Sequence, residues 1–226
     1  MHLNGKPILM EKEAEIIELH KTVLNPLRED AFEMDDIGKI ELISEKFRDI
    51  IELLGLDLTD DSIKDTPGRV AKMYVKEIFS GLNPQNKPSI TVFKNKYGYH
   101  TPLIELNIPF TSFCEHHFVP IQGKANIAYI PGDYVIGLSK IHRITDYYAR
   151  RPQVQERLTM QILQELSTSL QTKDVGVVLR ATHKCISCRG VEDLGSSTVT
   201  SAFTGQVLEN NNLISILLGS NMDKGS

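Results

Sequence analysis

The segment from Thr111 to Pro120 constrains this chain most, because it places one thiol and two imidazoles within four consecutive positions. Cys114 and His117 are separated by two residues, a spacing that lets both side chains reach one metal ion. A thiolate together with an imidazole suits zinc better than magnesium or calcium. Two protein ligands make an incomplete site, so the fold must bring a further ligand to this segment from elsewhere in the chain.

A second segment, from His183 to Gly190, is the candidate source of that ligand, because it contains Cys185 and Cys188. One interpretation is a three-ligand zinc site with an open position, the arrangement that activates water. The alternative is a closed four-ligand structural site that also uses Cys188, and spacing alone does not exclude it. Cys185 and Cys188 fit a thioredoxin-like redox motif less well than a metal site, because they do not open a helix after a first strand. The H-x-E and P-C-x-x-C signature of zinc cytidine deaminases is absent.

Two histidines remain beside the predicted metal site. His116 neighbours a ligand, and His183 lies two residues before Cys185. Each could be a core histidine with backbone partners. Two imidazoles that bracket a metal site more often transfer protons, since imidazole titrates near neutral pH.

Composition describes an ordinary globular chain. The 226 residues are 41% hydrophobic and 24% charged, which is enough to bury a core. The net charge of −4, without a long basic run, argues against a nucleic-acid partner. No apolar run approaches the roughly 20 residues of a membrane span, and the N-terminus lacks an apolar signal core. We therefore expect a cytoplasmic protein without a membrane partner. Three cysteines argue against a disulfide framework.

Hydrophobic periodicity predicts an α+β fold in which helices precede an antiparallel sheet. Helices are expected over 11–24, 36–54, 67–80, 140–149, 152–170 and 213–218, and strands over 103–110, 123–130, 135–138, 175–182 and 197–203. Alternation places Ile104, Leu106, Ile108 and Phe110 on one face of the first strand, and Ala125, Ile127 and Tyr129 on one face of the second. The helix over 152–170 is expected to bury one apolar row, formed by Val154, Leu158, Ile162, Leu166 and Leu170. Thr66 and Ser139 are the expected N-caps of two of these helices. The chain divides into an N-terminal arm (1–34), a helical region (35–88) and a main domain (89–226).

Basic residues gather at the start of the helix that follows Ser139. Lys140 and Arg143 lie in its first turns, where free backbone N–H groups favour anions. For each of these residues alone, ordinary surface charge is the favoured explanation. Together with Arg69, Lys72 and Arg189, elsewhere in the chain, they could hold a polyphosphate.

Gln155 and Glu156 lie in the long helix after Pro152. A carboxylate such as that of Glu156 can accept two hydrogen bonds from an N–H and NH2 edge, as guanine presents. The alternative is an ordinary exposed helix acid, and without further information that explanation is the simpler one.

Several motifs together resemble the GTP cyclohydrolase I family. They are Thr66-Pro-x-Arg69-Val-Ala-Lys-Met73-Tyr74, Cys114-Glu-His-His117, Tyr129-Ile-Pro131, Val135-Ile-Gly-Leu-Ser-Lys140, Arg151-Pro-Gln-Val-Gln-Glu-Arg157, and His183-x-Cys185 with Arg189-Gly190. The resemblance runs from about Ile37 to the last helix and does not cover residues 1–34. It implies a tunnelling fold, in which antiparallel sheets from several subunits join into a barrel with two helices of each subunit packed outside. It also implies a homodecamer of two stacked pentamers with sites between subunits.

The resemblance also assigns roles to residues of this chain. It implies that Cys114, His117 and Cys185 ligate one zinc ion, that His116 and His183 are acid–base groups, and that Ser139 relays a proton near the sugar. Glu156, with Gln155 beside it, would grip guanine. Lys72, Ser139, Lys140, Arg143 and Arg189 would hold a triphosphate.

The implied reaction converts GTP and water into formate and 7,8-dihydroneopterin triphosphate. Two other interpretations stay open. One is a non-catalytic, zinc-stabilised oligomer that binds a nucleotide or pterin. The other is a different tunnelling-fold enzyme that acts on a pterin or deazapurine.

Overall fold

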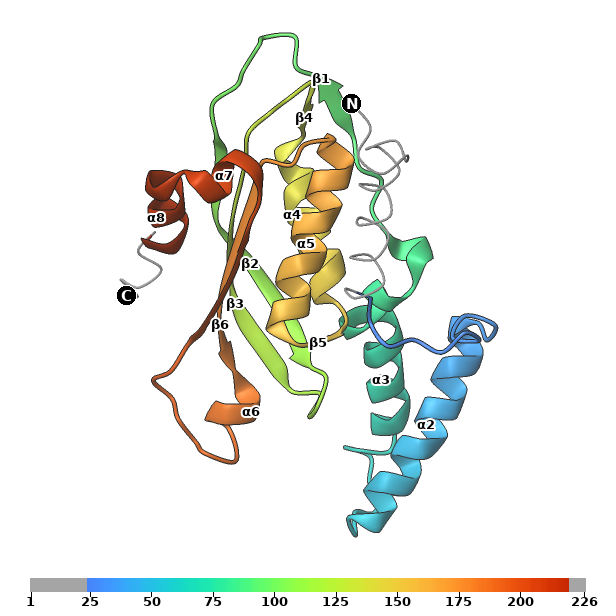
Figure 1. Ribbon diagram of the computed structural model, residues 1–226. Helices are drawn as coiled ribbons and strands as arrows, with labels where there is room; N and C mark the ends of the chain where they lie inside the picture. The colour runs from blue at the N-terminus through green and yellow to red at the C-terminus, as the bar shows by residue number, and fades with distance from the viewer. Residues whose placement is uncertain (1–23, 220–226) are drawn as a thin grey trace, which may run out of the picture.

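The computed structural model describes residues 24–219 and shows a twisted sheet with helices on both faces (Figure 1). The helix predicted over 11–24 lies outside the described residues, except for Leu24. The predicted division of the chain at residues 34 and 88 stays a prediction. Among the described residues, no helix combines the length and apolarity that a membrane crossing needs.

The main sheet has five strands in the order β5-β2-β3-β6-β7. Its members are β2 (Leu103–Cys114), β3 (Pro120–Tyr129), β5 (Pro152–Gln153), β6 (Val175–His183) and β7 (Thr198–Phe203). The strands pair antiparallel, as predicted, except that the short β5 runs parallel to the end of β2. A separate two-stranded sheet joins β1 (Val92–Lys94) to β4 (Tyr134–Ile136).

Two long helices cover one face of the sheet, as predicted (Figure 1). They are α4 (Leu138–Ala149) and α5 (Gln155–Leu170). The opposite face is covered by α7 (Gly205–Glu209) and α8 (Asn211–Gly219), of which the sequence predicted only the second. The short α6 (Lys184–Ser187) directly follows β6.

The helical region before the sheet contains α2 (Asp36–Leu53) and α3 (Thr66–Met73). Asp35 caps α2 by accepting a 2.8 Å hydrogen bond from the Gly38 backbone N–H, and Gly55 follows the helix with a φ of +82°. The chain leaves α3 through a π-helical turn, η1 (Tyr74–Ile78), and two short 3-10 helices, η2 (Ser80–Leu82) and η3 (Pro84–Asn86).

The core lies between the sheet and the α4–α5 pair. The apolar row of α5, spaced by four residues, is at most 1% exposed at Leu158, Ile162, Leu166 and Leu170, so the predicted face of this helix is confirmed. The inward positions predicted for β3 are confirmed as well, since Ala125, Ile127 and Tyr129 belong to the same core cluster.

The predicted face of β2 is wrong over its first half. A bulge between Glu105 and Ile108 inserts one residue, and Asn107 adopts a φ of +62° there. One extra residue moves all preceding side chains to the other face of a strand. Ile104 therefore packs with the α8 side and Leu106 is 40% exposed, whereas Ile108 faces the α4–α5 core.

Three predicted helix starts are also wrong. Asp65, not Thr66, precedes α3, and Gly137, not Ser139, precedes α4, so Thr66 and Ser139 lie inside the first turns of their helices. The helix α5 begins at Gln155 rather than Pro152, because Pro152 and Gln153 extend alongside β2 as β5. The hydrophobic periodicity of the sequence does not reveal the pairing of Pro152 and Gln153 with β2.

We expect Gly123→Ala to destabilise the fold strongly. Gly123 lies in β3, and an added Cβ would come within 2.2 Å of the Arg180 carbonyl oxygen and 2.6 Å of the Ala181 Cβ. Because a backbone atom of the paired strand cannot move aside alone, we expect a loss of about 2–3 kcal/mol in the free energy of unfolding. Chemical denaturation measures it. The control is Gly132→Ala, where an added Cβ would have no atom within 4 Å apart from those of its chain neighbours. Equal stability of the two variants would contradict this packing.

Candidate metal centre

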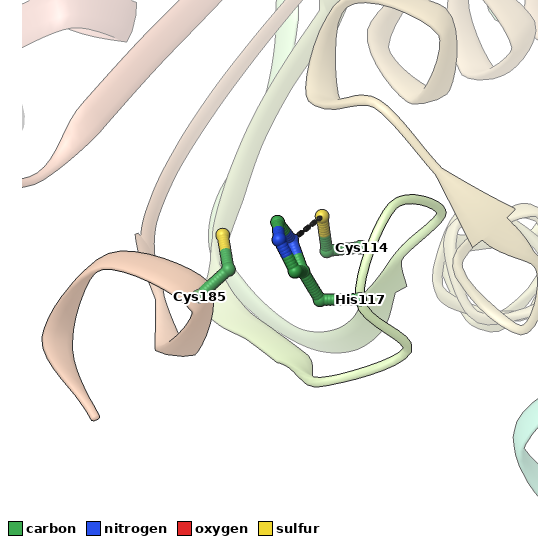
Figure 2. A group of neighbouring side chains, drawn as sticks. All are labelled: Cys114, His117 and Cys185. Atoms are coloured by element: carbon green, nitrogen blue, oxygen red, sulfur yellow. Dashed lines mark hydrogen bonds between the residues drawn. The ribbon is translucent and has the colours of Figure 1, made fainter. Parts of the chain in front are cut away.

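Three metal-binding side chains converge at one end of the sheet. Cys114 ends β2, His117 lies in the turn between β2 and β3, and Cys185 lies in α6. Figure 2 shows the three side chains pointing toward one another, and their ligand atoms all lie within 4.8 Å of each other. The Cys114 Sγ and the His117 Nδ1 are 3.8 Å apart. Tetrahedral zinc ligands of these types lie roughly 3.5–3.8 Å apart, so the trio fits a zinc ion after a shift of about 1 Å.

The turn that carries Cys114 and His117 is held by its own backbone. The Cys114 N–H donates to the Val119 carbonyl at 2.9 Å, and the Phe118 N–H donates back to the Cys114 carbonyl at 2.8 Å. Phe118 closes the turn with a φ of +53°. The Glu115 N–H donates to the Gln153 carbonyl on β5 at 3.0 Å, which ties the turn to the sheet edge.

The third ligand reaches this turn through strand pairing. Ile121, near the start of β3, pairs with His183 at the end of β6, and α6 begins at the next residue. Burial raises the pKa of the Cys185 thiol, and the neighbouring Cys114 sulfur adds to the rise while Arg189 opposes it. A metal ion held by Cys114 and Cys185 would reverse this preference, because metal coordination deprotonates a thiol.

The distances between the side chains differ among the possible ligand sets. The Nδ1 atoms of His116 and His117 lie almost equally near the Cys114 Sγ, at 3.7 and 3.8 Å, but only His117 also lies within reach of Cys185. Cys188 is exposed, and its Sγ donates to the Lys184 carbonyl at 2.8 Å. Over residues 24–219, the metal-binding group contains Cys114, His117 and Cys185 and leaves Cys188 out, so this arrangement does not favour the four-ligand alternative.

His183 lies beside the metal group and is held by Gln155. The Gln155 Nε2 donates to the Leu179 and Thr198 carbonyls, both at 3.1 Å, so the amide oxygen faces His183. The distance from this oxygen to the His183 Nε2 is 2.8 Å, and an amide oxygen accepts, so the His183 Nε2 carries the hydrogen. Burial lowers the pKa of His183, while the Glu156 carboxylate opposes this effect.

Gln155 itself is only 2% exposed. Its amide nitrogen also lies 3.1 Å from the Thr200 Oγ1. Both the nitrogen and the oxygen of the Gln155 amide therefore have partners within the protein, and in this chain Gln155 serves as the buried hydrogen-bond partner of His183. The predicted contact between Gln155 and a substrate stays a prediction.

Four other predicted site residues are exposed and lie outside the metal-binding group. The His116 side chain is 64% exposed. Glu156 is exposed in the first turn of α5 and close enough to His183 to influence its pKa. Arg189 is exposed in the segment after α6 and influences Cys185 in the same way. Lys72 is exposed on α3, in the helical region before the sheet.

The remaining basic group lies at the opposite end of the sheet. The Ile136 N–H donates to the Tyr129 hydroxyl at 3.3 Å, and α4, with Ser139, Lys140 and Arg143, starts just after Ile136. Tyr129 ends β3, whereas the metal turn adjoins its start at Pro120. These ten residues of strand span roughly 30 Å. Figure 1 likewise shows β4 and α6 near opposite ends of the main sheet, so one chain does not bring the start of α4 to its own metal group.

Sequence reasoning missed an ion pair that contacts the metal turn. The Arg157 Nη1 lies 2.5 Å from the Glu115 Oε2, and the Nη2 lies 3.3 Å from the Oε1. The hydrogen bond from Arg157 lowers the pKa of the Glu115 carboxyl. Both residues lie within the motifs described above, but nothing in a sequence links two charges 42 residues apart.

A cavity of about 520 Å³ lies apart from the metal ligands, between α2, η1 and the segment before α2. Its lining is mostly apolar and includes Phe47, Tyr74, Phe79 and Phe118. Phe118 follows His117 in sequence, yet none of the three metal-binding residues lines this cavity. This apolar cavity is therefore separate from the candidate metal centre.

The arrangement at the end of the sheet is typical of a metal-dependent hydrolytic centre. Three side chains that can bind a metal ion converge there, and one of them, His117, is exposed to solvent. Two further histidines, His116 and His183, lie beside these three side chains. Such centres keep one coordination position for water or substrate.

Comparison with known proteins identifies the family. Residues 43–219 match the family model of GTP cyclohydrolase I. The chain is 58% identical to GTP cyclohydrolase 1 of Flavobacterium johnsoniae over 182 residues, which cover 80% of this chain and 82% of that protein. It is 49% identical to GTP cyclohydrolase 1 of Citrobacter koseri over 199 residues, which cover 87% of this chain and 90% of that protein. The chain therefore belongs to the GTP cyclohydrolase I family, and the resemblance found in its motifs is confirmed.

A solved structure of an archaeosine synthase, QueF-Like in the apo form, aligns with 47% of this chain and 94% of its own, with a TM-score of 0.38 and 17% identity. That likeness is too weak to establish the detailed fold.

Proposed function

We propose that this protein catalyses the GTP cyclohydrolase I reaction, the first step of pterin and tetrahydrofolate biosynthesis. It opens the imidazole ring of the guanine in GTP, releases formate and forms 7,8-dihydroneopterin triphosphate. The observation that carries the proposal is the group of Cys114, His117 and Cys185 with His183 and His116 beside it. The family membership of the chain and the names of its relatives support the same activity.

Cys114, His117 and Cys185 hold one zinc ion per subunit in this proposal. Their donor set of two sulfurs and one imidazole nitrogen is suited to zinc. When bound at such a centre, zinc supplies a Lewis acid that makes water reactive at neutral pH.

The histidines manage protons at the guanine ring. Because the His183 Nε2–H is donated to Gln155, the Nδ1 atom is left to exchange a proton with the ring nitrogen of guanine. A proton on that nitrogen makes C8 more susceptible to attack. His116 is the second acid–base group, and Ser139 relays a proton near the ribose during the later rearrangement and closure of the pterin ring.

The remaining residues bind and orient GTP. The Glu156 carboxylate accepts hydrogen bonds from the N–H and NH2 edge of guanine, with Gln155 beneath it. Lys72, Lys140, Arg143 and Arg189 hold the triphosphate. Binding energy from the triphosphate, remote from the reacting atoms, then positions C8 at the metal centre.

The proposed site requires more than one subunit. Within one chain, Lys140 and Arg143 lie at the far end of the sheet from Cys114, so the triphosphate pocket at a given metal ion comes from a neighbouring copy. In the described part of the chain, β7 has a partner on one side only, and β2 pairs with β5 only through Phe113 and Cys114. Such open edges favour pairing between subunits. The family resemblance implies a tunnelling-fold barrel and a decamer of two stacked pentamers, and we propose that assembly for this chain.

Turnover of GTP is the direct test, and it separates this activity from the two other interpretations. Incubation of the pure protein with GTP, followed by oxidation, should yield a fluorescent pterin. We expect His183→Ala to keep its zinc and lose about 10²–10⁴-fold in kcat, as expected for loss of an acid–base group. The control is His100→Ala, a histidine whose Nδ1 instead lies 3.2 Å from the Pro131 carbonyl oxygen. A wild-type protein that binds zinc without converting GTP would refute the proposed reaction.

Mixed oligomers test whether two subunits share one site. Cys185→Ala lacks a metal ligand, and Lys140→Ala/Arg143→Ala lacks part of the triphosphate pocket, so each should be nearly inactive at low GTP concentration. Co-expressed at equal levels, they should form about a quarter of their sites from two intact halves, which partial recovery of activity would reveal.

The matched control for this experiment is co-expression of Cys114→Ala with Cys185→Ala. Both substitutions damage the metal half, so no combination of subunits restores a site. Equal activity in the two mixtures, or no recovery in either, would contradict a shared site.

A further inference from the structure

Taking both partners together, the ion pair between Glu115 and Arg157 is the least exposed pair between a carboxylate and a lysine or arginine among the described residues. The exposed fractions of the two side chains are 23% and 17%, whereas those of Asp146 and Arg150 are 54% and 42%. Two nitrogens of the guanidinium meet both carboxylate oxygens, at 2.5 and 3.3 Å. A shielded, two-point contact of this kind restrains geometry far better than an exposed pair.

Glu115 lies between the two ligands of the metal turn. Cys114 precedes it, and His116 and His117 follow. Its backbone N–H donates to the Gln153 carbonyl, and its carboxylate meets Arg157 on α5. The backbone and the side chain of this one residue therefore attach the metal turn to two other elements, β5 and α5.

The same turn of α5 is attached to the strand that leads to Cys185. Gln155, two residues before Arg157, donates to the Leu179 carbonyl on β6 and accepts from His183 at the end of β6. The first turn of α5 thus connects the segment with Cys114 and His117 to the segment with Cys185. This connection is independent of the pairing between β3 and β6.

We infer that Arg157 is a positioning residue, which acts through Glu115 to hold Cys114 and His117 at a metal-binding separation from Cys185. The inference rests on the metal centre of the proposed function. It assigns Arg157 no contact with guanine or phosphate. Groups that orient metal ligands from outside the coordination sphere typically change metal affinity or activity by about 10–100-fold when removed.

A double-mutant cycle on the full-length protein tests the inference. Zinc affinity is measured by competition with a chelator in the wild type, Arg157→Met, Glu115→Gln and the double variant. We expect each single substitution to raise the dissociation constant of zinc by about 10–100-fold. Because Arg157 acts through Glu115, the double variant should bind zinc no more weakly than the single variant with the lower zinc affinity.

Two further variants and the GTP kinetics separate positioning from other roles. Arg157→Lys should restore part of the zinc affinity, because lysine keeps the charge but not the two-point geometry. Arg150→Met, which removes an exposed pair outside the centre, should leave zinc affinity unchanged. In zinc-saturated Arg157→Met, the KM for GTP should stay within about threefold of the wild-type value, since no substrate contact is lost.

Wild-type zinc affinity in Arg157→Met would overturn the inference. Additive effects in the double variant, or a large rise in KM at saturating zinc, would overturn it as well, since Arg157 would then act on something other than Glu115. If Arg157→Met does not fold, the zinc affinity of the nearly isosteric Glu115→Gln variant tests the same contact, and a wild-type affinity there would overturn the inference too. A wild-type protein that binds zinc but does not convert GTP sinks only the proposed reaction, because zinc affinity is measured without turnover.

Discussion

The antiparallel pairing of β3 with β6 is the constraint on which the metal centre depends. Its register sets Ile121 opposite His183, which brings the end of β6 beside the turn that begins at Cys114. Because α6 starts immediately after β6, Cys185 reaches the same place. A shift of one residue would turn the side chains of β6 to the other face. The ligands would separate, and the apolar face of β6 would leave the core.

The length of the same sheet separates the metal-binding residues from the basic residues at the start of α4. Soft metal ligands and histidines gather where β2, β3 and β6 meet, while Lys140 and Arg143 lie near the Tyr129 end of β3. In the proposed function, a chain built this way carries two half-sites that it cannot join by itself. Assembly with other copies joins them in our proposal, and the open edges of β2 and β7 give a physical route to that assembly.

The sequence predicted those features that depend on residue type and spacing. The residues of the candidate metal group and the inward face of β3 belong to these features, because thiol chemistry and period-two alternation are local signals. Features that depend on partners distant in the chain were missed. The bulge before Ile108 places Ile104 on the face opposite to the predicted one. Because Pro152 pairs with β2, α5 begins at Gln155 instead of Pro152. The contact between Glu115 and Arg157 left no local signal at all.

X-ray absorption spectroscopy at the zinc edge tests the metal centre most directly. For the zinc-loaded wild-type protein, we predict two sulfur ligands at about 2.3 Å, one imidazole nitrogen and one further light atom. The spectrum of Cys188→Ala should be the same. A third sulfur in the wild type that disappears in Cys188→Ala would show a closed four-ligand site, and would contradict a centre with a position left open for chemistry.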